Sequence, residues 1–329
     1  MDLLVTGGAG YIGSHLTDAL LESGHRVTVL DNLTTGSRTN LEPALATGRC
    51  ELVEGDIREA RTVERLVARS QGVFHLAAVV GVKHVIEHPL EMMLVNVDGT
   101  ANVLAAAASS AVPIMVASSS EVYGDGAREP FQEEEESVIG PTSQPRWGYA
   151  LAKALDEHLA FAYHADQGLP TVAVRYFNSY GPRMDGTGYG SVIAKFIAQA
   201  LREEPLTVYG DGTQSRAFTY IDDTVHCTIV AFEKMLERPE VRGKVFNAGY
   251  PHATSILELA EQIRQLTGAK SEIEFVPFEK AYGRTFAEPK RRIPDMTRSR
   301  DLLGFEPQVP LAEGLRRTLA WARRAYVQV

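Results

Sequence analysis

A glycine-rich turn near the start of the chain restricts the fold more than any other feature. An apolar run at residues 3–6 leads directly into Gly7-Gly8-Ala9-Gly10-Tyr11-Ile12-Gly13, and an amphipathic stretch at residues 12–22 follows. The glycines fit either Gly8-x-Gly10-x-x-Gly13 or Gly7-x-x-Gly10-x-x-Gly13. Small residues in a strand-to-helix turn let the backbone approach a pyrophosphate, and the helix N-terminus favours its negative charge. The segment therefore predicts a dinucleotide site at the end of the first strand.

Short apolar runs alternate with helix-length amphipathic segments over the first half of the chain. We expect strands at residues 3–6, 26–30, 51–54, 72–77, 114–118 and 171–177, and helices at residues 12–22, 62–69, 96–109 and 149–167. Such β-α-β repetition gives a parallel sheet covered by helices. The predicted fold class is α/β, a Rossmann doubly wound parallel sheet with a smaller interleaved α/β substrate domain.

The alternation ends after Phe177, where a loop rich in Gly, Pro and Asn begins. Helices are then expected at residues 191–203, 255–267 and 311–326, and strands at residues 206–209, 245–248 and 272–276. We predict a cofactor-binding Rossmann domain of residues 1–177 plus 216–248, and a substrate domain of residues 178–215 plus 249–329. The acidic run at residues 133–136 is expected to be a solvated loop.

Composition narrows the class of partner. The 329 residues include 33 Lys and Arg against 42 Asp and Glu, a net charge of −9, which argues against nucleic acid or an anionic membrane as the main partner. The two cysteines, Cys50 and Cys227, form neither a metal motif nor a disulfide framework. The chain runs straight into its first strand and has no apolar run of membrane-spanning length. We therefore expect a cytoplasmic protein without a structural metal.

Acidic residues after the next two strands bear on which dinucleotide binds. Asp31 lies at the end of the second expected strand, where a carboxylate bonds both ribose hydroxyls and repels a 2′-phosphate. This position favours NAD over NADP. Asp56 follows the third strand, and the sequence leaves open whether it contacts the adenine or caps the next helix.

A tyrosine and a lysine carry the predicted chemistry. Tyr149 and Lys153 are four residues apart in an expected helix, so both lie on one face. A nearby cation favours the phenolate, and we expect Lys153 to lower the pKa of Tyr149 and make it a general base near neutral pH. About thirty residues earlier, Ser118-Ser119-Ser120-Glu121 ends a strand.

Together these segments resemble the extended short-chain dehydrogenase/reductase family of NAD-dependent nucleotide-sugar enzymes. The resemblance covers nearly the whole chain. Beyond the residues above, it rests on Asp56-Ile57, His75-Leu76-Ala77-Ala78, Asn96, Arg175-Tyr176-Phe177-Asn178, Tyr180-Gly181-Pro182-Arg183, Val208-Tyr209-Gly210-Asp211-Gly212 and Gln214-Ser215-Arg216-Ala217-Phe218. Within the family the chain is most similar to the UDP-glucuronate decarboxylases, with the 4-epimerases and 4,6-dehydratases close behind.

The resemblance implies a role for each matched residue. Tyr149 takes a proton from the sugar 4-hydroxyl while hydride leaves C4 for NAD⁺, Ser119 hydrogen-bonds the same oxygen, and Lys153 holds the nicotinamide ribose. The implied cofactor contacts are Gly7, Gly10, Tyr11, Ile12, Gly13, Asp31, Asn32, Asp56, Ile57, Leu76, Ala77, Ala78, Asn96, Tyr149 and Lys153. The implied contacts to a UDP-sugar are Val82, Asn178, Arg183, Val192, Tyr209, Arg216 and Arg292.

Three reactions share this first oxidation, and Glu121 and Arg292 bear on the choice. An epimerase needs no further acid or base, a 4,6-dehydratase needs an acid to expel the 6-hydroxyl, and a decarboxylase loses a C6 carboxylate that is β to the new ketone. Ser119-Ser120-Glu121 resembles the Thr-Ser-Glu of the decarboxylases, and Arg292 matches an arginine that handles their carboxylated sugar. We expect UDP-glucuronate decarboxylation, with Ser119, Ser120, Glu121, Tyr149, Lys153 and Arg292 as the catalytic set. A UDP-sugar 4-epimerase and a 4,6-dehydratase are the alternatives, and a non-enzymatic NAD sensor is disfavoured.

The resemblance also implies a homodimer, formed through helices near residues 96–109 and 149–167. Their many small residues permit close packing.

Overall fold

Seven parallel strands form the centre of the computed structural model, which describes residues 1–125, 128–186, 191–278, 280 and 291–326. The strands are β1 (Asp2–Thr6), β2 (Arg26–Asp31), β3 (Cys50–Glu54), β4 (Gly72–His75), β5 (Ile114–Ser119), β6 (Thr171–Tyr176) and β11 (Lys244–Ala248). Their order across the sheet is β11-β6-β5-β4-β1-β2-β3, and every pair is parallel. The predicted α/β doubly wound class is confirmed.

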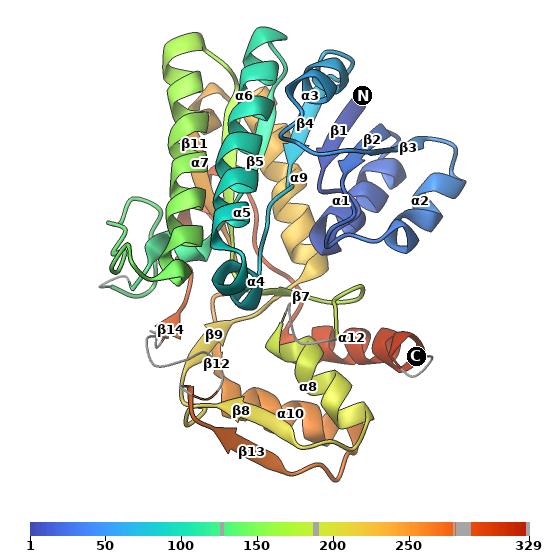
Figure 1. Cartoon of the computed structure of the whole chain (residues 1–329), viewed down its shortest axis with the longest axis vertical. Helices are drawn as coiled ribbons and strands as arrows, with labels where there is room; N and C mark the ends of the chain where they lie inside the picture. Colours follow the sequence, from blue (N-terminus) through green and yellow to red (C-terminus); the bar gives the residue numbers. More distant parts are fainter. Residues whose placement is uncertain (126–127, 187–190, 279, 281–290, 327–329) are drawn as a thin grey trace.

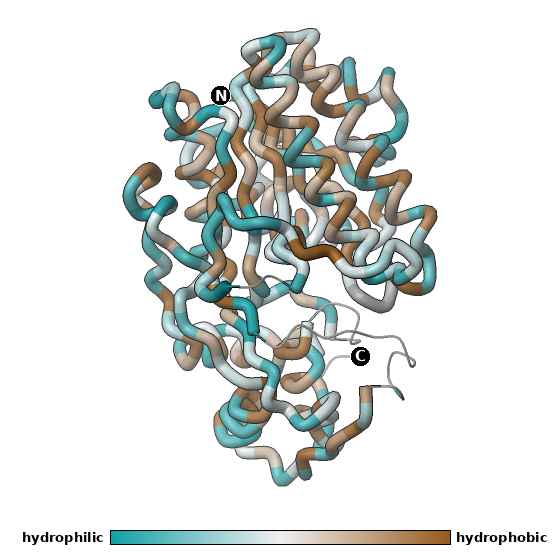
Figure 2. The backbone as a smooth tube through the Cα atoms, turned by 90° about the vertical axis from the view of Figure 1, so that its left-hand side faces the viewer, coloured by the Kyte–Doolittle hydropathy of each residue, from teal (hydrophilic) through white to brown (hydrophobic). Residues whose placement is uncertain are grey.

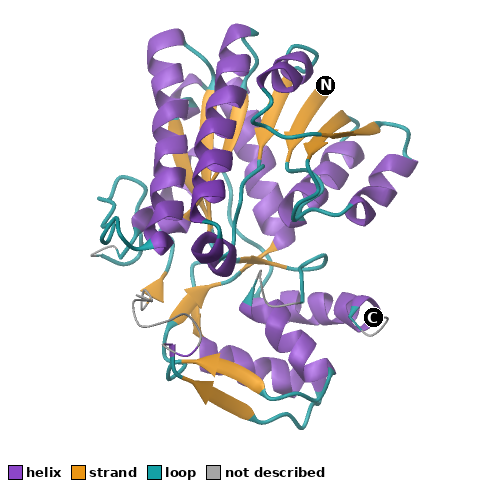
Figure 3. Cartoon of the chain, viewed as in Figure 1, coloured by secondary structure: helices purple, strands orange, loops and turns teal. Residues whose placement is uncertain are grey.

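Helices cover both faces of this sheet because successive apolar residues of each strand point to opposite sides. Leu3 and Val5 of β1 pack in one core with α1 (Tyr11–Glu22) and α9 (Ile221–Glu237). Leu4, between them, packs in a second core with three helices, α3 (Ala60–Val67), α6 (Gly99–Ser109) and α7 (Pro145–Gln167). Figure 3 shows the two helical layers, and Figure 2 shows brown, apolar segments along the packed strands and helices.

Smaller elements near the carboxyl end of the large sheet form the second group in Figure 1. This group contains α8 (Val192–Leu201), α10 (Ile256–Thr267) and α12 (Leu311–Ala325), with β8 (Leu206–Tyr209) parallel to β13 (Ile273–Val276). A three-stranded sheet has the order β12-β9-β14, from β12 (Ala253–Ser255), β9 (Ser215–Ala217) and β14 (Arg291–Arg292). Finally, β7 (Ser179–Tyr180) pairs with β10 (Thr219–Tyr220). The core around α9 extends continuously into α8 and α10, so the two groups share one apolar interior.

The remaining elements are short and lie in the connections. They are η1 (Arg38–Leu41), α2 (Glu42–Ala46), α4 (Val82–Glu87), α5 (Pro89–Met93), η2 (Leu94–Asp98), η3 (Ser120–Tyr123), η4 (Pro239–Val241) and η5 (Ser299–Leu303).

Helix α7 is the element that presents the predicted catalytic pair, and it starts earlier than expected. It begins at Pro145, four residues before the predicted start at Tyr149, and Gly168 ends it in a left-handed conformation. Proline suits the first turn of a helix because its missing N–H would have no partner there. Tyr149 therefore lies inside regular helix, where its position is fixed.

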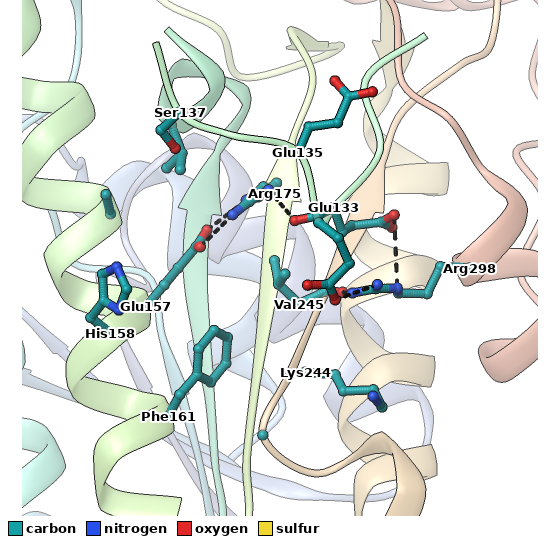
Figure 4. Close-up of a pocket in the computed structure, with 14 residues that line it drawn as sticks. Glu133, Glu135, Ser137, Glu157, His158, Phe161, Arg175, Lys244, Val245 and Arg298 are labelled. Carbon is teal, nitrogen blue, oxygen red and sulfur yellow. Dashed lines mark hydrogen bonds and ion pairs between the residues drawn. The ribbon is translucent and has the colours of Figure 1, made fainter. Parts of the chain in front are cut away.

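Buried charges tie α7 to the sheet. Arg175 on β6 forms two hydrogen bonds with the Glu157 carboxylate, at 2.8 and 2.7 Å, and Ser118 on β5 donates to the same carboxylate at 2.5 Å. Figure 4 shows the Arg175–Glu157 pair at the wall of a cavity of about 330 Å³. The interaction joins the helix to two strands at the end of the sheet where Ser119 lies.

The acidic run at residues 133–136 differs from the predicted solvated loop. Glu133 is buried, and its carboxylate accepts the Asn247 backbone N–H at 2.9 Å. Its backbone oxygen accepts a hydrogen bond from Arg175 at 3.2 Å, and the neighbouring Glu134 pairs with Arg298 at 2.5 Å. The prediction is wrong for Glu133 because cations from β6 and from residue 298 give the acidic segment buried partners.

The Glu157–Arg175 pair gives a prediction about stability. Glu157→Leu leaves the buried guanidinium without its carboxylate, so we expect the free energy of unfolding to fall by about 3 kcal/mol. Adding Arg175→Met should recover part of the loss, because no buried charge then remains unpaired. Urea unfolding measures both variants. Asp301→Asn, which breaks an exposed pair with Arg300, is the control and should cost under about 1 kcal/mol; equal losses in Glu157→Leu and Asp301→Asn would contradict the prediction.

Candidate active site

The glycine turn forms a cradle that side chains would fill. Gly7 has φ +72°, and a Cβ there would lie 2.7 Å from the Ala77 backbone nitrogen. A Cβ on Gly13 would lie 2.1 Å from the Gly7 carbonyl oxygen. These backbone contacts favour the Gly7-x-x-Gly10-x-x-Gly13 pattern. Helix α1 begins after Gly10 without a side-chain cap and without an acidic residue in its first turn, so its N–H groups suit a pyrophosphate.

Asp31 lies beside this cradle with its carboxylate fixed. One carboxylate oxygen accepts the Ala9 backbone N–H at 2.9 Å, and the other accepts the Leu33 N–H at 2.8 Å. Burial raises the pKa of Asp31, and the two backbone hydrogen bonds act in the opposite direction. Each oxygen keeps a lone pair for a ribose hydroxyl. The cradle and Asp31 together fit NAD.

Asp56 and Asn32 lie at the next strand end. Arg58 binds Asp56 at 2.6 Å, and Asn32 donates to it at 3.3 Å. The hydrogen bond from Arg58 holds the pKa of Asp56 below its usual range. Helix α3 is capped at Glu59, so the alternative in which Asp56 caps that helix is wrong. An adenine contact for Asp56 stays a prediction.

The loop after β4 is held by Asn96. Its side-chain oxygen accepts the Val79 N–H at 2.7 Å, and its side-chain nitrogen donates to the Val79 carbonyl at 3.1 Å. The amide is fully buried. Through Val79, Asn96 fixes the segment of Leu76, Ala77 and Ala78 predicted to contact the cofactor. Ile57, also predicted there, is buried against the start of α6.

Ser119 lies at the end of β5, and Tyr149 and Lys153 lie on successive turns of α7. The Ser119 side chain acts on the Tyr149 phenol, and its hydroxyl oxygen accepts the Glu121 backbone N–H at 3.2 Å. The pKa of Tyr149 nevertheless rises, chiefly through burial and then through the negative charge of Glu121, while the Ser119 hydrogen bond acts in the opposite direction. The expected lowering by Lys153 is therefore wrong for this structure.

Lys153 is directed to other partners. Its ammonium donates to the Ala117 carbonyl and to the Asp156 carboxylate, both at 3.1 Å. Lys153 and Asp156 are both buried, so the ion pair is shielded from water. Because Asp156 offsets the lysine charge, Lys153 alone does not make Tyr149 acidic.

Glu121 and Arg292 form a bidentate ion pair, although 171 residues of sequence separate them. The sequence analysis identified the two residues separately. One guanidinium nitrogen donates to Oε1 and the other to Oε2, the second at 2.9 Å. Arg292 reaches Glu121 from β14, which pairs with β9 so that Arg292 lies opposite Arg216.

A third arginine, Arg146, lies 3.7 Å from Glu121. Burial favours the neutral form of Glu121, but Arg292, Arg146 and Arg216 outweigh it and lower the pKa of the carboxyl to about 2. Glu121 is therefore ionised at neutral pH. Arginine side chains of this kind suit the binding of an anionic ligand.

The sequence analysis did not identify Arg146 as a site residue. Its spacing could have identified it, because Arg146 precedes Tyr149 by three residues and so lies on the same helix face. The same spacing applies to Asp156 and Glu157, which follow Lys153 on the buried face of α7. Ser120 is buried next to Glu121 in the short helix η3.

The predicted UDP-sugar contacts occupy several places. Asn178 donates to the Ala217 carbonyl at 3.1 Å, next to Arg216. Arg183 pairs with Asp18 of α1 at 2.6 Å, away from the Glu121 cluster. The Tyr209 ring at the end of β8 lies under the Lys195 ammonium, 3.9 Å from the ring centre. Val192 begins α8.

Two of the predicted regions fall partly outside the described residues. Val82 begins α4, but its side chain is not described. Lys290, which precedes Arg291 and Arg292, is outside the described residues. Within the described ranges, no cluster of His, Cys, Asp and Glu has metal-site geometry, and no helix is long and apolar enough to cross a membrane.

Comparisons with known proteins identify the family of the chain. The sequence model of the NAD dependent epimerase/dehydratase family matches residues 3–249. A UDP-N-acetyl-alpha-D-glucosaminuronate decarboxylase from Bacillus cytotoxicus is 43% identical over 97% of both chains. UDP-glucuronic acid decarboxylase 1 from Xenopus tropicalis is 37% identical over 98% of this chain and 72% of the relative.

A solved structure shares the fold. UDP-glucuronic acid 4-epimerase from Bacillus cereus, determined with UDP-glucuronic acid and NAD, has a TM-score of 0.86 and 30% identity, covering 99% of this chain and 100% of the other. Similarity over the full length, together with the glycine cradle, Asp31 and the Ser119–Tyr149–Lys153 set, leads to one assignment. The chain is an NAD-using enzyme and belongs to the NAD dependent epimerase/dehydratase family.

Proposed function

We propose that this enzyme decarboxylates a UDP-linked hexuronic acid, with UDP-glucuronate as the first substrate to test. The observation that carries the proposal is the Glu121–Arg292 ion pair. Arg146 lies 3.7 Å from Glu121, and the negative charge of Glu121 raises the pKa of Tyr149. Arginines near the tyrosine suit a sugar that carries a negative charge at C6. Relatives named as decarboxylases support the same reading.

In the proposed reaction, the chain's residues act on two sugar carbons in turn. NAD held by the glycine cradle and Asp31 would supply the hydride acceptor for C4 and, at the end, the hydride donor. Tyr149 takes the proton of the 4-hydroxyl, and Ser119 hydrogen-bonds that oxygen. Because the C6 carboxylate is then β to a ketone, the C5–C6 bond breaks with loss of CO₂, and C5 of the resulting enolate takes up a proton.

The ionised state of Glu121 separates the candidate reactions. A 4,6-dehydratase needs an acid to protonate the leaving hydroxyl, and a carboxyl with a pKa of about 2 is a poor donor at neutral pH. A 4-epimerase needs no additional charged group. A decarboxylase needs cations that place the C6 carboxylate. The negative charge of that carboxylate passes to the enolate when CO₂ leaves. Arg292 and Arg146 meet that need.

A second substrate is the N-acetylated hexuronate. The relative from Bacillus cytotoxicus is 43% identical over 97% of this chain, and its name specifies UDP-N-acetyl-glucosaminuronate. The Xenopus tropicalis relative, named for UDP-glucuronic acid, is 37% identical. Both sugars carry the C6 carboxylate on which the proposal depends, so both belong in the assay.

Product analysis tests the proposal. The purified enzyme, incubated with each UDP-hexuronate, should release CO₂ and leave a UDP-pentose with the corresponding loss of mass. Tyr149→Phe should lower kcat by about 10²-fold or more while NAD binding survives, because only the proton acceptor is lost. Tyr163→Phe, farther along α7, is the matched control and should retain activity. UDP-galacturonate formed without CO₂ would instead support an epimerase, and loss of water from a neutral hexose would support a dehydratase.

We also propose that the enzyme works as a cytoplasmic homodimer. Helices α6 and α7 lie side by side on the outside of the sheet (Figure 1). Leu151 and Leu155, one turn apart on α7, are 38% and 41% exposed. Exposed leucines beside a helix rich in alanine suit close packing against a second copy.

Light scattering tests the dimer. The unmodified protein should have twice the chain mass, and a Leu151→Glu/Leu155→Glu variant should be a monomer because like charges would meet across the two-fold axis. Phe275→Glu, on the exposed side of β13, adds a charge at a comparably exposed apolar site and should leave the mass doubled. A Leu151→Glu/Leu155→Glu variant that stays dimeric would rule out this surface.

A further inference from the structure

A buried amide on the central sheet bonds to separate segments of the chain. Asn247 lies in β11 and has no exposed surface. Its side-chain oxygen accepts the Tyr123 hydroxyl at 2.7 Å. Its side-chain nitrogen donates to the Phe131 carbonyl at 2.9 Å and to the Asp295 carbonyl at 3.0 Å. One side chain therefore links η3, the segment around Phe131 and the segment that follows β14.

The partners of Asn247 allow only one orientation of its amide. Both carbonyls can only accept, so the NH₂ group must face them, and the oxygen is left for the Tyr123 hydroxyl. The backbone of Asn247 is paired as well. Its N–H donates to the Glu133 carboxylate at 2.9 Å, and its carbonyl accepts the Ser299 hydroxyl at 2.6 Å. A buried polar residue with these hydrogen bonds made is costly to displace, so Asn247 is a rigid anchor.

Two of the segments that Asn247 links carry the members of the Glu121–Arg292 pair. Tyr123 follows Glu121 by two residues within η3, and Asp295 follows Arg292 by three residues. Because Glu121 and Arg292 are distant in sequence, local structure alone cannot set the separation of their side chains. A residue that holds both segments can set it.

Phe131 strengthens the same connection. Its N–H donates to the Ile293 carbonyl at 2.8 Å, and its carbonyl accepts the Asp295 N–H at 2.9 Å. Its ring stacks on the Tyr123 ring, with the centres 4.8 Å apart. Strand β14 is only two residues long, so the hydrogen bonds at residues 293 and 295 extend its attachment beyond the pairing with β9.

We propose that Asn247 is a positioning residue for the Glu121–Arg292 pair, because it fixes both segments to one point of the central sheet. The inference rests on the proposed function only in taking the pair to act on the C6 carboxylate. A bidentate ion pair depends on the alignment of both groups. Loss of the amide should therefore loosen the pair while the sheet stays folded.

Two substitutions release the anchor to different extents. Asn247→Ala removes all three side-chain hydrogen bonds. Tyr123→Phe keeps the ring stacked on Phe131 and removes only the hydroxyl that binds Asn247, so it is the milder variant. Tyr326→Phe is the matched control, because it also removes one phenol hydroxyl, which donates to the Met184 carbonyl at 2.8 Å. Urea unfolding establishes that each variant is folded.

The first test reads the ion pair without any turnover. Phenylglyoxal modifies accessible arginines, and mass spectrometry compares Arg292, whose side chain is 4% exposed, with its exposed neighbour Arg291 as the internal reference. Relative to Arg291, Arg292 should react several-fold faster in Asn247→Ala, less so in Tyr123→Phe, and at the unmodified rate in Tyr326→Phe. An Arg292 rate in either folded anchor variant equal to that of the control would overturn the proposal.

The second test separates positioning from general stability. In a single turnover with a UDP-hexuronate, Asn247→Ala should slow CO₂ release roughly tenfold or more while nicotinamide reduction stays near the unmodified rate. Added to Arg292→Met, Asn247→Ala should slow CO₂ release little further, because both changes act on one interaction. Equal slowing of both signals, or full additivity with Arg292→Met, would overturn the proposal. If the unmodified protein released no CO₂, the proposed function would fail, while the reactivity of Arg292 would still test the anchor.

Discussion

Helix α7 brings charged side chains into an apolar interior, and the site depends on how each of them is paired. An unpaired charge there would cost several kcal/mol, so partners must come from other elements. Lys153 is paired with Asp156, Glu157 with Arg175 of β6, and Arg146 with Glu121. These pairs fix the helix relative to β5 and β6, and they thereby fix Tyr149 relative to Ser119. The rigidity of the catalytic set follows from the pairing.

The pairing also determines the electrostatics of the reaction. With Lys153 neutralised by Asp156 and Glu121 ionised nearby, Tyr149 is held protonated. Glu121 is in turn held ionised by three arginines that come from α7, β9 and β14. An anionic substrate entering this cluster meets arginine side chains suited to bind it. The charge around Tyr149 therefore changes when substrate and cofactor bind. Proton transfer to Tyr149 then depends on whether both are bound.

Much of the fold could be predicted from the sequence because it depends on local patterns. The bounds of β8, Leu206–Tyr209, agree with the prediction, and Ser255 caps α10 where a helix was expected to start. Helix α9 was not predicted, because β-branched residues such as Thr224, Val225 and Ile229 lower its helix propensity. Packing against the sheet outweighs this low propensity in the folded chain. Strands β9 and β14 are too short to show any periodicity.

The site was predictable as a set of residues but not as a set of pairs. Spacing identified Tyr149 and Lys153, and the resemblance to the family identified Ser119, Glu121 and Arg292. No spacing rule connects Glu121 with Arg292, since their contact depends on β14 lying beside β9. The predicted pKa of Tyr149 was wrong for a related reason. Burial and the lysine's own partner, Asp156, decide the charge balance, and both are properties of the packed structure.

In the proposed reaction, the Glu121–Arg292 pair governs the fate of the oxidised sugar, separately from the oxidation itself. The direct measurement follows two signals in a single turnover of Arg292→Met with substrate labelled with ¹³C at C6: absorbance of reduced nicotinamide and release of ¹³CO₂. The account predicts that nicotinamide reduction stays close to the unmodified rate while CO₂ release slows roughly 10²-fold. If both signals slowed by the same factor, Arg292 would serve binding or oxidation in general, and the claim would be contradicted.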